Sequence, residues 1–226
     1  MKRGAALALA LLCVQGMAWA HGVSGGDKGF VERSVGTQLI AFAYLGAKHM
    51  VTGYDHLLFL FGVIFFLYRM KDVALYVTLF AVGHSVTLLY GVLAGTHANP
   101  YLIDALIGLS VVYKGLDNLG AFERWLGFRP DPRAAVAAFG LAHGFGLATK
   151  LQEFQLSPDG LVANIVAFNV GVEVGQLLAL ALMLIAMGLL RASSRFERNA
   201  YLANGALVCA GFVLAGYQMA GYTMLS

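Results

Sequence analysis

Six polar residues lie within stretches of this chain that are apolar enough to cross a lipid bilayer. They are Asp55, His56, His84, His143, Asn169 and Glu173. An ionisable side chain at the centre of a membrane helix costs about 2.5–3.5 kcal/mol on insertion scales, so such residues are rarely without a function. Imidazole and carboxylate groups are the ligands that divalent transition metal ions prefer. We therefore expect a metal site between membrane-spanning helices.

The densest polar cluster begins at His49 and ends with Asp55 and His56. On a continuous helix the two histidines would share one face, because an offset of seven residues is about two turns. Gly53 lies between them, and a break or bend there would change the direction of Asp55. Asp55 would then bind the metal or accept a hydrogen bond from a ligand histidine and hold its tautomer. The alternative is a capping aspartate beside a structural histidine.

His84 and His143 lie near the middle of two further apolar segments and have small neighbours, which allow another helix to approach closely. Their surroundings are similar in sequence: Phe80-Ala-Val-Gly83-His84-Ser85 and Phe139-Gly-Leu-Ala142-His143-Gly144. The similarity indicates a degenerate parallel repeat or the general likeness of glycine-rich helices. We expect both histidines to face the metal site, with Ser85 as a weaker oxygen donor.

A later segment contains Asn169, Glu173 and Gln176, whose offsets of four and seven predict one polar stripe on a helix. A carboxylate between two amides inside a membrane span is difficult to explain by packing alone. Glu173 is therefore predicted as a metal ligand, a proton carrier or the partner of a buried cation, and the two amides as supporting residues.

Two further polar groups lie in the segment around 101–119. Asp104 is near its outer end and is a supporting candidate for the site, with an exposed or capping role as the alternative. Lys114 and Asp117 share a face with Ser110 near the other end. Since a lysine there can extend toward the membrane surface, we expect Lys114 to pair with Asp117 in a structural role.

The composition restricts the class of protein. Hydrophobic residues make up 59% and charged residues 12% of the chain, with a mean hydropathy of +0.74. A soluble domain has about 25% charged residues. The formal net charge is only +3, and the basic residues lie mostly in loops, so we expect no nucleic-acid partner. The predicted fold is an all-α polytopic membrane helix bundle.

The first 20 residues predict a cleaved signal peptide. Lys2 and Arg3 precede an apolar run at 5–14, and Ala18-Trp19-Ala20 is a small-x-small cleavage site. An uncleaved first helix is the alternative. Cleavage would make His21 the mature N-terminus, where its amine and imidazole could capture metal outside the cytoplasm. Otherwise residues 21–34 are simply an extracytoplasmic polar tail.

Residues 35–226 predict a domain of six transmembrane helices after a helical lead-in at 35–52. The predicted spans are about 53–69, 73–95, 101–119, 134–150, 161–190 and 200–222. One set of alternate loops between the spans contains eight basic residues: Arg69, Lys71, Arg124, Arg129, Arg133, Arg191, Arg195 and Arg198. The other set contains only Lys150. Since basic loops remain in the cytoplasm, both mature termini should lie outside a bacterial inner membrane.

The donor types narrow the choice of ion. Three imidazoles with one or two carboxylates suit Ni, Co, Zn or Cu(II). Mg²⁺ and Ca²⁺ would need a site richer in oxygen. Cys13 would leave with the signal peptide and Cys209 would remain alone, so one mature chain has no disulfide and no thiolate pair.

The chain resembles the HupE/UreJ family of bacterial membrane proteins over nearly its whole length. The resemblance rests on Gly53-Tyr-Asp55-His56-Leu-Leu-Phe-Leu, Gly83-His84-Ser85-Val-Thr-Leu, Phe139-Gly-Leu-Ala-His143-Gly and Phe168-Asn169-Val-Gly-Val-Glu173-Val-Gly-Gln176. It implies a nickel or cobalt permease connected with hydrogenase or urease maturation. It also leaves room for a homo-oligomer or for metalloenzyme maturation partners.

One family pattern is incomplete in this chain. Hydrogenase-linked members have Phe-His-Gly-x-Ala-His-Gly-x-Glu, whose second half resembles the sequence around His143. The first histidine of the pattern falls on Gly140 and the final glutamate on Gly146. The chain therefore resembles a divergent branch, in which Glu173 is a candidate to replace the missing acid.

The predicted function is a permease for Ni²⁺ or Co²⁺, with Zn²⁺ or Cu²⁺ as other possible ions. The metal-site residues are His49, Asp55, His56, His84, His143 and Glu173. One alternative is an intramembrane zinc hydrolase, similar to the transmembrane ceramidase-like hydrolases, with Ser85 next to the metal. Another is a metal-binding accessory subunit without transport activity.

Overall fold

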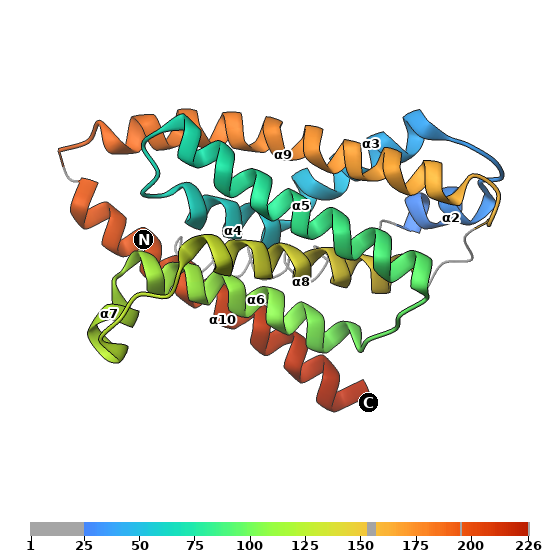
Figure 1. Ribbon diagram of the computed structural model, residues 1–226. Coiled ribbons are helices and arrows are strands. Elements are labelled where there is room, and N and C mark those ends of the chain that lie inside the picture. Colours follow the sequence, from blue (N-terminus) through green and yellow to red (C-terminus); the bar gives the residue numbers. More distant parts are fainter. Residues whose placement is uncertain (1–24, 153–156, 195, 226) are drawn as a thin grey trace, which may run out of the picture.

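The computed structural model describes residues 25–152, 157–194 and 196–225, and this part of the chain contains helices and no strands (Figure 1). The helices are α2 (Gly25–Arg33), α3 (Leu39–Thr52), α4 (Tyr54–Ile64), α5 (Met70–Ala94), α6 (Pro100–Asn118), α7 (Ala121–Leu126), α8 (Pro132–Gln152), α9 (Leu161–Arg191) and α10 (Phe196–Leu225). The predicted signal peptide and His21 lie outside the described residues. The described chain is thus an all-α bundle.

Four of the described helices are long and apolar enough to cross a membrane: α5, α8, α9 and α10. They correspond to the spans predicted at 73–95, 134–150, 161–190 and 200–222. Helices α3 and α4 are apolar but shorter. Helix α6 has 19 residues and contains three charged ones, Asp104, Lys114 and Asp117, which distinguishes it from the four apolar helices.

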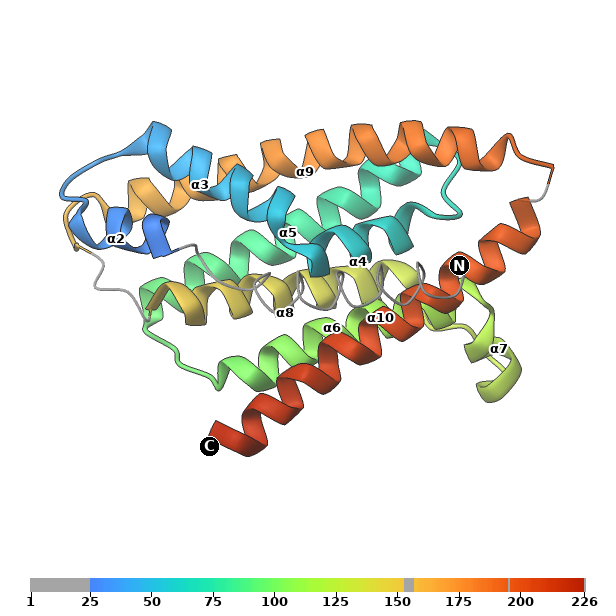
Figure 2. The ribbon, with the colours of Figure 1, turned by 180° about the vertical axis from the view of Figure 1, so that it is seen from behind.

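The predicted helical lead-in at 35–52 and the first predicted span at 53–69 correspond to two separate helices, α3 and α4. Gly53 has an extended backbone, with φ −75° and ψ 97°, so the chain bends between α3 and α4 (Figure 2). Its N–H closes α3 by donating to the His49 carbonyl at 2.9 Å, and its own carbonyl accepts from Leu57 N–H at 3.1 Å to begin α4. Of the two possibilities that the sequence left open at Gly53, a continuous helix or a break, the structure has the break. The predicted end of the first span at 69 was wrong, because α4 ends at Ile64.

The end of α4 is held by a side chain from another helix. Arg191, the last residue of α9, donates from Nη2 to the carbonyls of Ile64, Phe65 and Leu67 at 2.8, 2.8 and 3.0 Å. The last carbonyls of a helix have no partner within it, so a cation at this position satisfies them and complements the helix dipole. This contact fixes the short helix α4 against the end of the longer α9.

The turn between α5 and α6 follows from local sequence. Gly95 has φ 60°, a left-handed conformation that glycine adopts without steric cost, and it ends α5. Asn99 then caps α6 by accepting from the N–H groups of Tyr101 and Leu102 at 3.0 and 3.4 Å. Pro100 occupies the first turn, where its missing N–H is not needed. The result is a short connection at one end of the bundle.

Glycines allow the helices to pack closely in pairs. Helix α3 lies against α9, α5 against α8, and α6 against α10. A Cβ on Gly171 of α9 would overlap the Ala43 carbonyl of α3, and one on Gly140 of α8 would overlap the Phe80 carbonyl of α5. At the third pair, a Cβ on Gly108 would lie 2.6 Å from Ala215 N. Small residues at such contacts are typical of membrane helices, whose association depends on close packing.

Substitution of Gly171 tests this packing. We expect Gly171→Ala to lower the free energy of unfolding by about 1–3 kcal/mol, because the added methyl group forces α3 away from α9. Gly188→Ala, in the same helix, is the control, since its Cβ would meet nothing within 4 Å. Thermal unfolding of both variants in detergent measures the difference. Equal melting temperatures would contradict close packing at Gly171.

Candidate metal site

Three histidine rings gather around His56 in the interior of the bundle. The centroid of the His56 ring lies 5.2 Å from that of His49, 5.7 Å from that of His84 and 4.8 Å from that of His143. His49 comes from α3, His56 from α4, His84 from α5 and His143 from α8. Separate helices therefore bring together the histidines that the sequence predicted.

The break at Gly53 puts Asp55 and His56 in the first turn of α4, where both are 3% exposed. Asp55 Oδ1 lies 3.1 Å from His56 Nδ1. With a proton on Nδ1, the imidazole donates to the carboxylate and keeps the lone pair on Nε2, the tautomer that binds metals. His56 Nε2 is buried and has no hydrogen-bond partner among the described residues. A Cβ on Gly53 would lie 3.0 Å from His56 Nδ1, so the glycine also provides space.

The other two central histidines are oriented differently. His143 Nδ1 lies 2.7 Å from the Phe139 carbonyl one turn earlier in α8, a contact that sets the proton on Nδ1. His84 is 1% exposed, and neither of its ring nitrogens has a hydrogen-bond partner among the described residues. Buried polar groups are nearly always satisfied, so the two nitrogens of this ring stand out among the described residues.

A narrow cavity of about 10 Å³ lies beside three of the four histidine rings, but His84 is not part of its lining. It is lined by His49, Asp55, His56, Asp104, Ile107, His143, Gly146, Leu147 and Lys150. A cavity of this size has room for about one water molecule. In the described part of the chain, no three His, Cys, Asp or Glu side chains are already arranged to hold one metal ion. An ion would therefore require rotation of the rings that surround the cavity.

Glu173 does not join the histidine cluster. Asn169 and Gln176 are buried, 6% and 1% exposed, but Glu173 lies on the exposed side of α9 beside Val170 and Val174. At about 100° per residue, Glu173 is about 40° beyond Asn169 around the helix, just past the edge of the buried face. The prediction of one buried polar stripe was therefore wrong for Glu173.

The two amides on α9 have local structural contacts. Gln176 Nε2 donates to the Val77 carbonyl of α5 at 3.3 Å, and Asn169 Nδ2 donates to the Ile165 carbonyl at 3.2 Å. Ser85 is half-buried and is absent from the described residues that line the histidine cavity. None of the three faces this cavity in the arrangement described.

Asp104 is a second buried acid that lines the cavity, in addition to Asp55. It is 5% exposed, so the alternative of an exposed or capping role was wrong, and its Oδ2 lies 2.7 Å from Lys150 Nζ. Sequence reasoning missed Lys150. The available signal was its offset of seven from His143, which places both on one face of α8.

The two similar sequences around His84 and His143 lie side by side. Helices α5 and α8 run in the same direction (Figure 1), and a Cβ on Gly144 would overlap the His84 carbonyl. The same glycine faces Thr87, whose hydroxyl donates to the Leu141 carbonyl at 2.7 Å. The close contact brings the two histidines to the same depth in the bundle.

A family model described as HupE / UreJ protein matches residues 25–226, nearly the whole chain. The chain belongs to this family. No curated protein and no solved structure matches it. HupE/UreJ membership together with the apolar helices indicates a multi-pass membrane protein related to metal-ion transport.

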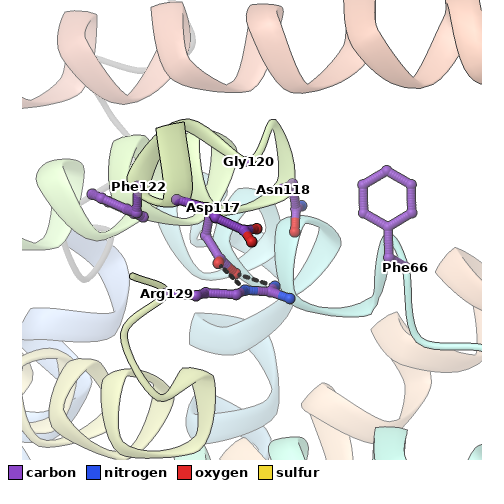
Figure 3. Close-up of a pocket in the computed structure, with 7 residues that line it drawn as sticks. Phe66, Asp117, Asn118, Gly120, Phe122 and Arg129 are labelled. Carbon is purple, nitrogen blue, oxygen red and sulfur yellow. Dashed lines mark hydrogen bonds and ion pairs between the residues drawn. The ribbon is translucent and has the colours of Figure 1, made fainter. Parts of the chain in front are cut away.

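A second polar cluster of this HupE/UreJ protein lies at the opposite end of α6 (Figure 3). Asp117 accepts from Lys114 Nζ at 2.6 Å and from Arg129 Nε and Nη2 at 2.8 and 3.1 Å. The predicted Lys114–Asp117 pair is confirmed, and Arg129 is an addition that the sequence did not reveal. Its hydrogen bonds to Asp117 raise the pKa of Arg129 above the ordinary value.

A cavity of about 310 Å³ opens beside this cluster, lined by Phe66, Asp117, Asn118, Gly120, Phe122, Glu123 and Arg129. It has more room than the histidine cavity, but its lining contains no imidazole. Both oxygens of Asp117 are already engaged by Lys114 and Arg129. We therefore assign a structural role to this cluster.

Substitutions in the second cluster test that role. Asp117 and Lys114 are 1% and 8% exposed in their side chains, whereas Arg129 is 54% exposed. We expect Asp117→Asn to destabilise the protein by about 3–5 kcal/mol, because it leaves a buried cation uncompensated. Arg129→Gln, the control, should cost about 1 kcal/mol or less. Thermal unfolding measures both, and equal losses would contradict the assignment.

Proposed function

We propose that this protein is a permease for a divalent transition metal ion, with Ni²⁺ or Co²⁺ as the transported ion. The observation that carries the proposal is the cluster of imidazole rings around His56, at the break between α3 and α4. Helix breaks inside membrane proteins are tolerated where they line a cavity, and transporters build ion sites at such breaks. Family membership supports the same assignment.

The roles of the residues follow from their contacts. His56 and His84 bind the ion through ring nitrogens that have no hydrogen-bond partner among the described residues. Asp55 holds the His56 ring and supplies a negative charge, which lowers the cost of a divalent cation in the bilayer. His49 and His143 complete the set of imidazoles. Imidazole is a ligand that suits Ni²⁺ and Co²⁺.

The four imidazole rings come from different helices, and this arrangement suits transport. Conduction requires a site that binds strongly enough to dehydrate an ion and weakly enough to release it. Because the ligands of this proposed site come from different helices, small helix movements change its coordination. A rigid structural site would instead hold its ion tightly.

We further propose six membrane spans, with the bent pair α3–α4 as the first and α6 as the third. The turn after α4, helix α7 and the turn before α10 lie at one end of the bundle (Figure 1), and these connections are rich in basic residues. Basic connections remain in the cytoplasm, so the opposite end and the C-terminus face the outside of the inner membrane. A cleaved signal peptide at 1–20 is consistent with this orientation.

Each charged residue of α6 has an ion-pair partner, which supports its place as a membrane span. Asp104 pairs with Lys150, and Asp117 pairs with Lys114 and Arg129. Paired charges cost much less in a membrane interior than isolated ones. The charged residues that distinguish α6 from the four most apolar helices are thus neutralised by ion pairs within the bundle.

The hydrolase alternative has less support. It required a hydroxyl next to the metal to polarise a carbonyl, and the candidate was Ser85. Ser85 is only half-buried and is absent from the lining of the histidine cavity, whereas its buried neighbour His84, although also outside that lining, has its ring 5.7 Å from that of His56. An accessory subunit that binds metal without moving it differs from the permease only in transport, so uptake is the deciding measurement.

Replacement of His56 tests the proposal directly. We expect His56→Ala to reduce Ni²⁺ or Co²⁺ accumulation by producing cells at least about tenfold, because the central ligand is lost. The control is His97→Ala, since His97 is an exposed histidine in the turn after α5. Uptake of a radioactive ion and elemental mass spectrometry of purified protein provide the measurement. Unchanged uptake in the His56 variant would refute the permease, and one tightly held Zn²⁺ per chain would favour the hydrolase.

Replacement of Asp55 should weaken metal binding without abolishing it. We expect Asp55→Asn to weaken Co²⁺ binding about 10–100-fold, the range found when a partner of a ligand histidine is lost. The amide can still contact Nδ1, so the ring remains near its place, but the negative charge is gone. Titration of the purified variant with Co²⁺ measures the affinity. An affinity equal to that of wild type would show that Asp55 acts only as a helix cap.

A further inference from the structure

The histidine cavity extends along one face of α8. His143, Gly146, Leu147 and Lys150 line it at offsets of three, four and seven, which places them along one stripe of the helix. At 1.5 Å per residue, the stripe covers about 10 Å from the imidazole to the lysine. Lys150 is 18% exposed in its side chain, whereas His143 is buried. Lys150 therefore stands at a more accessible end of the cavity.

Asp104 faces this stripe from α6. Its Oδ2 lies 2.7 Å from Lys150 Nζ, and its Oδ1 is buried with no hydrogen-bond partner among the described residues. A Cβ on Gly146 would lie only 3.8 Å from that oxygen, and 3.0 Å from the side chains of Ile103 and Ile107. Gly146 thus leaves the space beside Asp104 clear of a side chain.

We propose that Asp104 is an additional cation-binding residue of this cavity, and that Lys150 occupies it as a tethered competitor until a divalent ion displaces the ammonium group. The proposal rests on the metal-permease function and deepens it. One Asp104 oxygen is engaged by the lysine and the other lies in the same cavity as the imidazoles, so an ion can meet the carboxylate before the ammonium leaves.

The chemistry of lysine suits this exchange. An ammonium group is a donor only, so it can neutralise the carboxylate but cannot replace an imidazole or a metal at the histidines. Its flexible four-carbon stem allows the charge to swing toward water after displacement. A divalent ion gains more from a carboxylate and neighbouring imidazoles than a monovalent ion does. Lys150 would therefore exclude monovalent cations and keep the buried charge balanced between transport events.

Binding of Co²⁺ to the purified full chain in detergent tests the proposal, by isothermal titration and by the visible absorption of the ion. We expect Lys150→Met to raise the affinity about tenfold, because a competing cation is removed, and Asp104→Asn to lower it about tenfold. Arg129→Gln is the matched control. It removes a cation from a buried aspartate at the other end of α6 and should leave the affinity unchanged.

The double variant separates competition from simple repulsion. If Lys150 competes for Asp104, then Lys150→Met should raise the Co²⁺ affinity very little in a chain that also carries Asp104→Asn. A gain equal to or larger than that in the wild-type background would show repulsion through space and would overturn the proposal. No change in affinity with either single variant would also overturn it. Lys150→Arg, which keeps the charge and the pair, should behave as wild type and serves as a second folded variant.

The Co²⁺-binding experiment and the uptake experiment can fail separately, so they distinguish this inference from the permease function. If Asp104 and Lys150 control Co²⁺ affinity but the His56 variant accumulates metal normally in cells, the binding site stands and the transport function fails. If uptake depends on His56 while both Asp104 and Lys150 variants bind Co²⁺ as wild type does, the permease stands and this inference fails. A wild-type protein that binds no Co²⁺ overturns the inference.

Discussion

The proposed site depends on the break in the backbone at Gly53. Without it, residues 39–64 would continue as one helix, and Asp55 would point away from the face shared by His49 and His56. The extended backbone at this residue ends α3 and begins α4, so Asp55 and His56 enter the bundle together in a first helical turn. The hydrogen bond between them then sets which imidazole nitrogen is available for a ligand.

Close helix packing makes the rest of the cluster possible. His84 and His143 come from helices whose backbones touch, because Gly144 has no side chain to keep the His84 carbonyl at a distance. A larger residue would separate the helices and withdraw the rings from His56. The same glycines that associate the helices therefore also determine how near the imidazoles lie, so packing and chemistry in this protein cannot be changed independently.

The outcome for the acidic residues shows where sequence reasoning reached its limit. The break at Gly53 and the Lys114–Asp117 pair were predictable, because both depend on contacts within a few residues. Glu173 was misjudged for a physical reason, and the same reason left the burial of Asp104 open. A helical stripe has an edge, and the position of that edge depends on the neighbouring helices, which periodicity does not identify.

The sequence by itself determined the class of molecule, the family, the segments that form apolar helices and the residue types available for metal chemistry. These follow from composition, local backbone preference and motif spacing. Only the tertiary structure decided that Asp104 and Lys150 share a cavity with the histidines and that Glu173 does not. The reason is that Asp104 and Lys150 meet across two helices that are far apart along the chain, and burial of a side chain is a property of that packing.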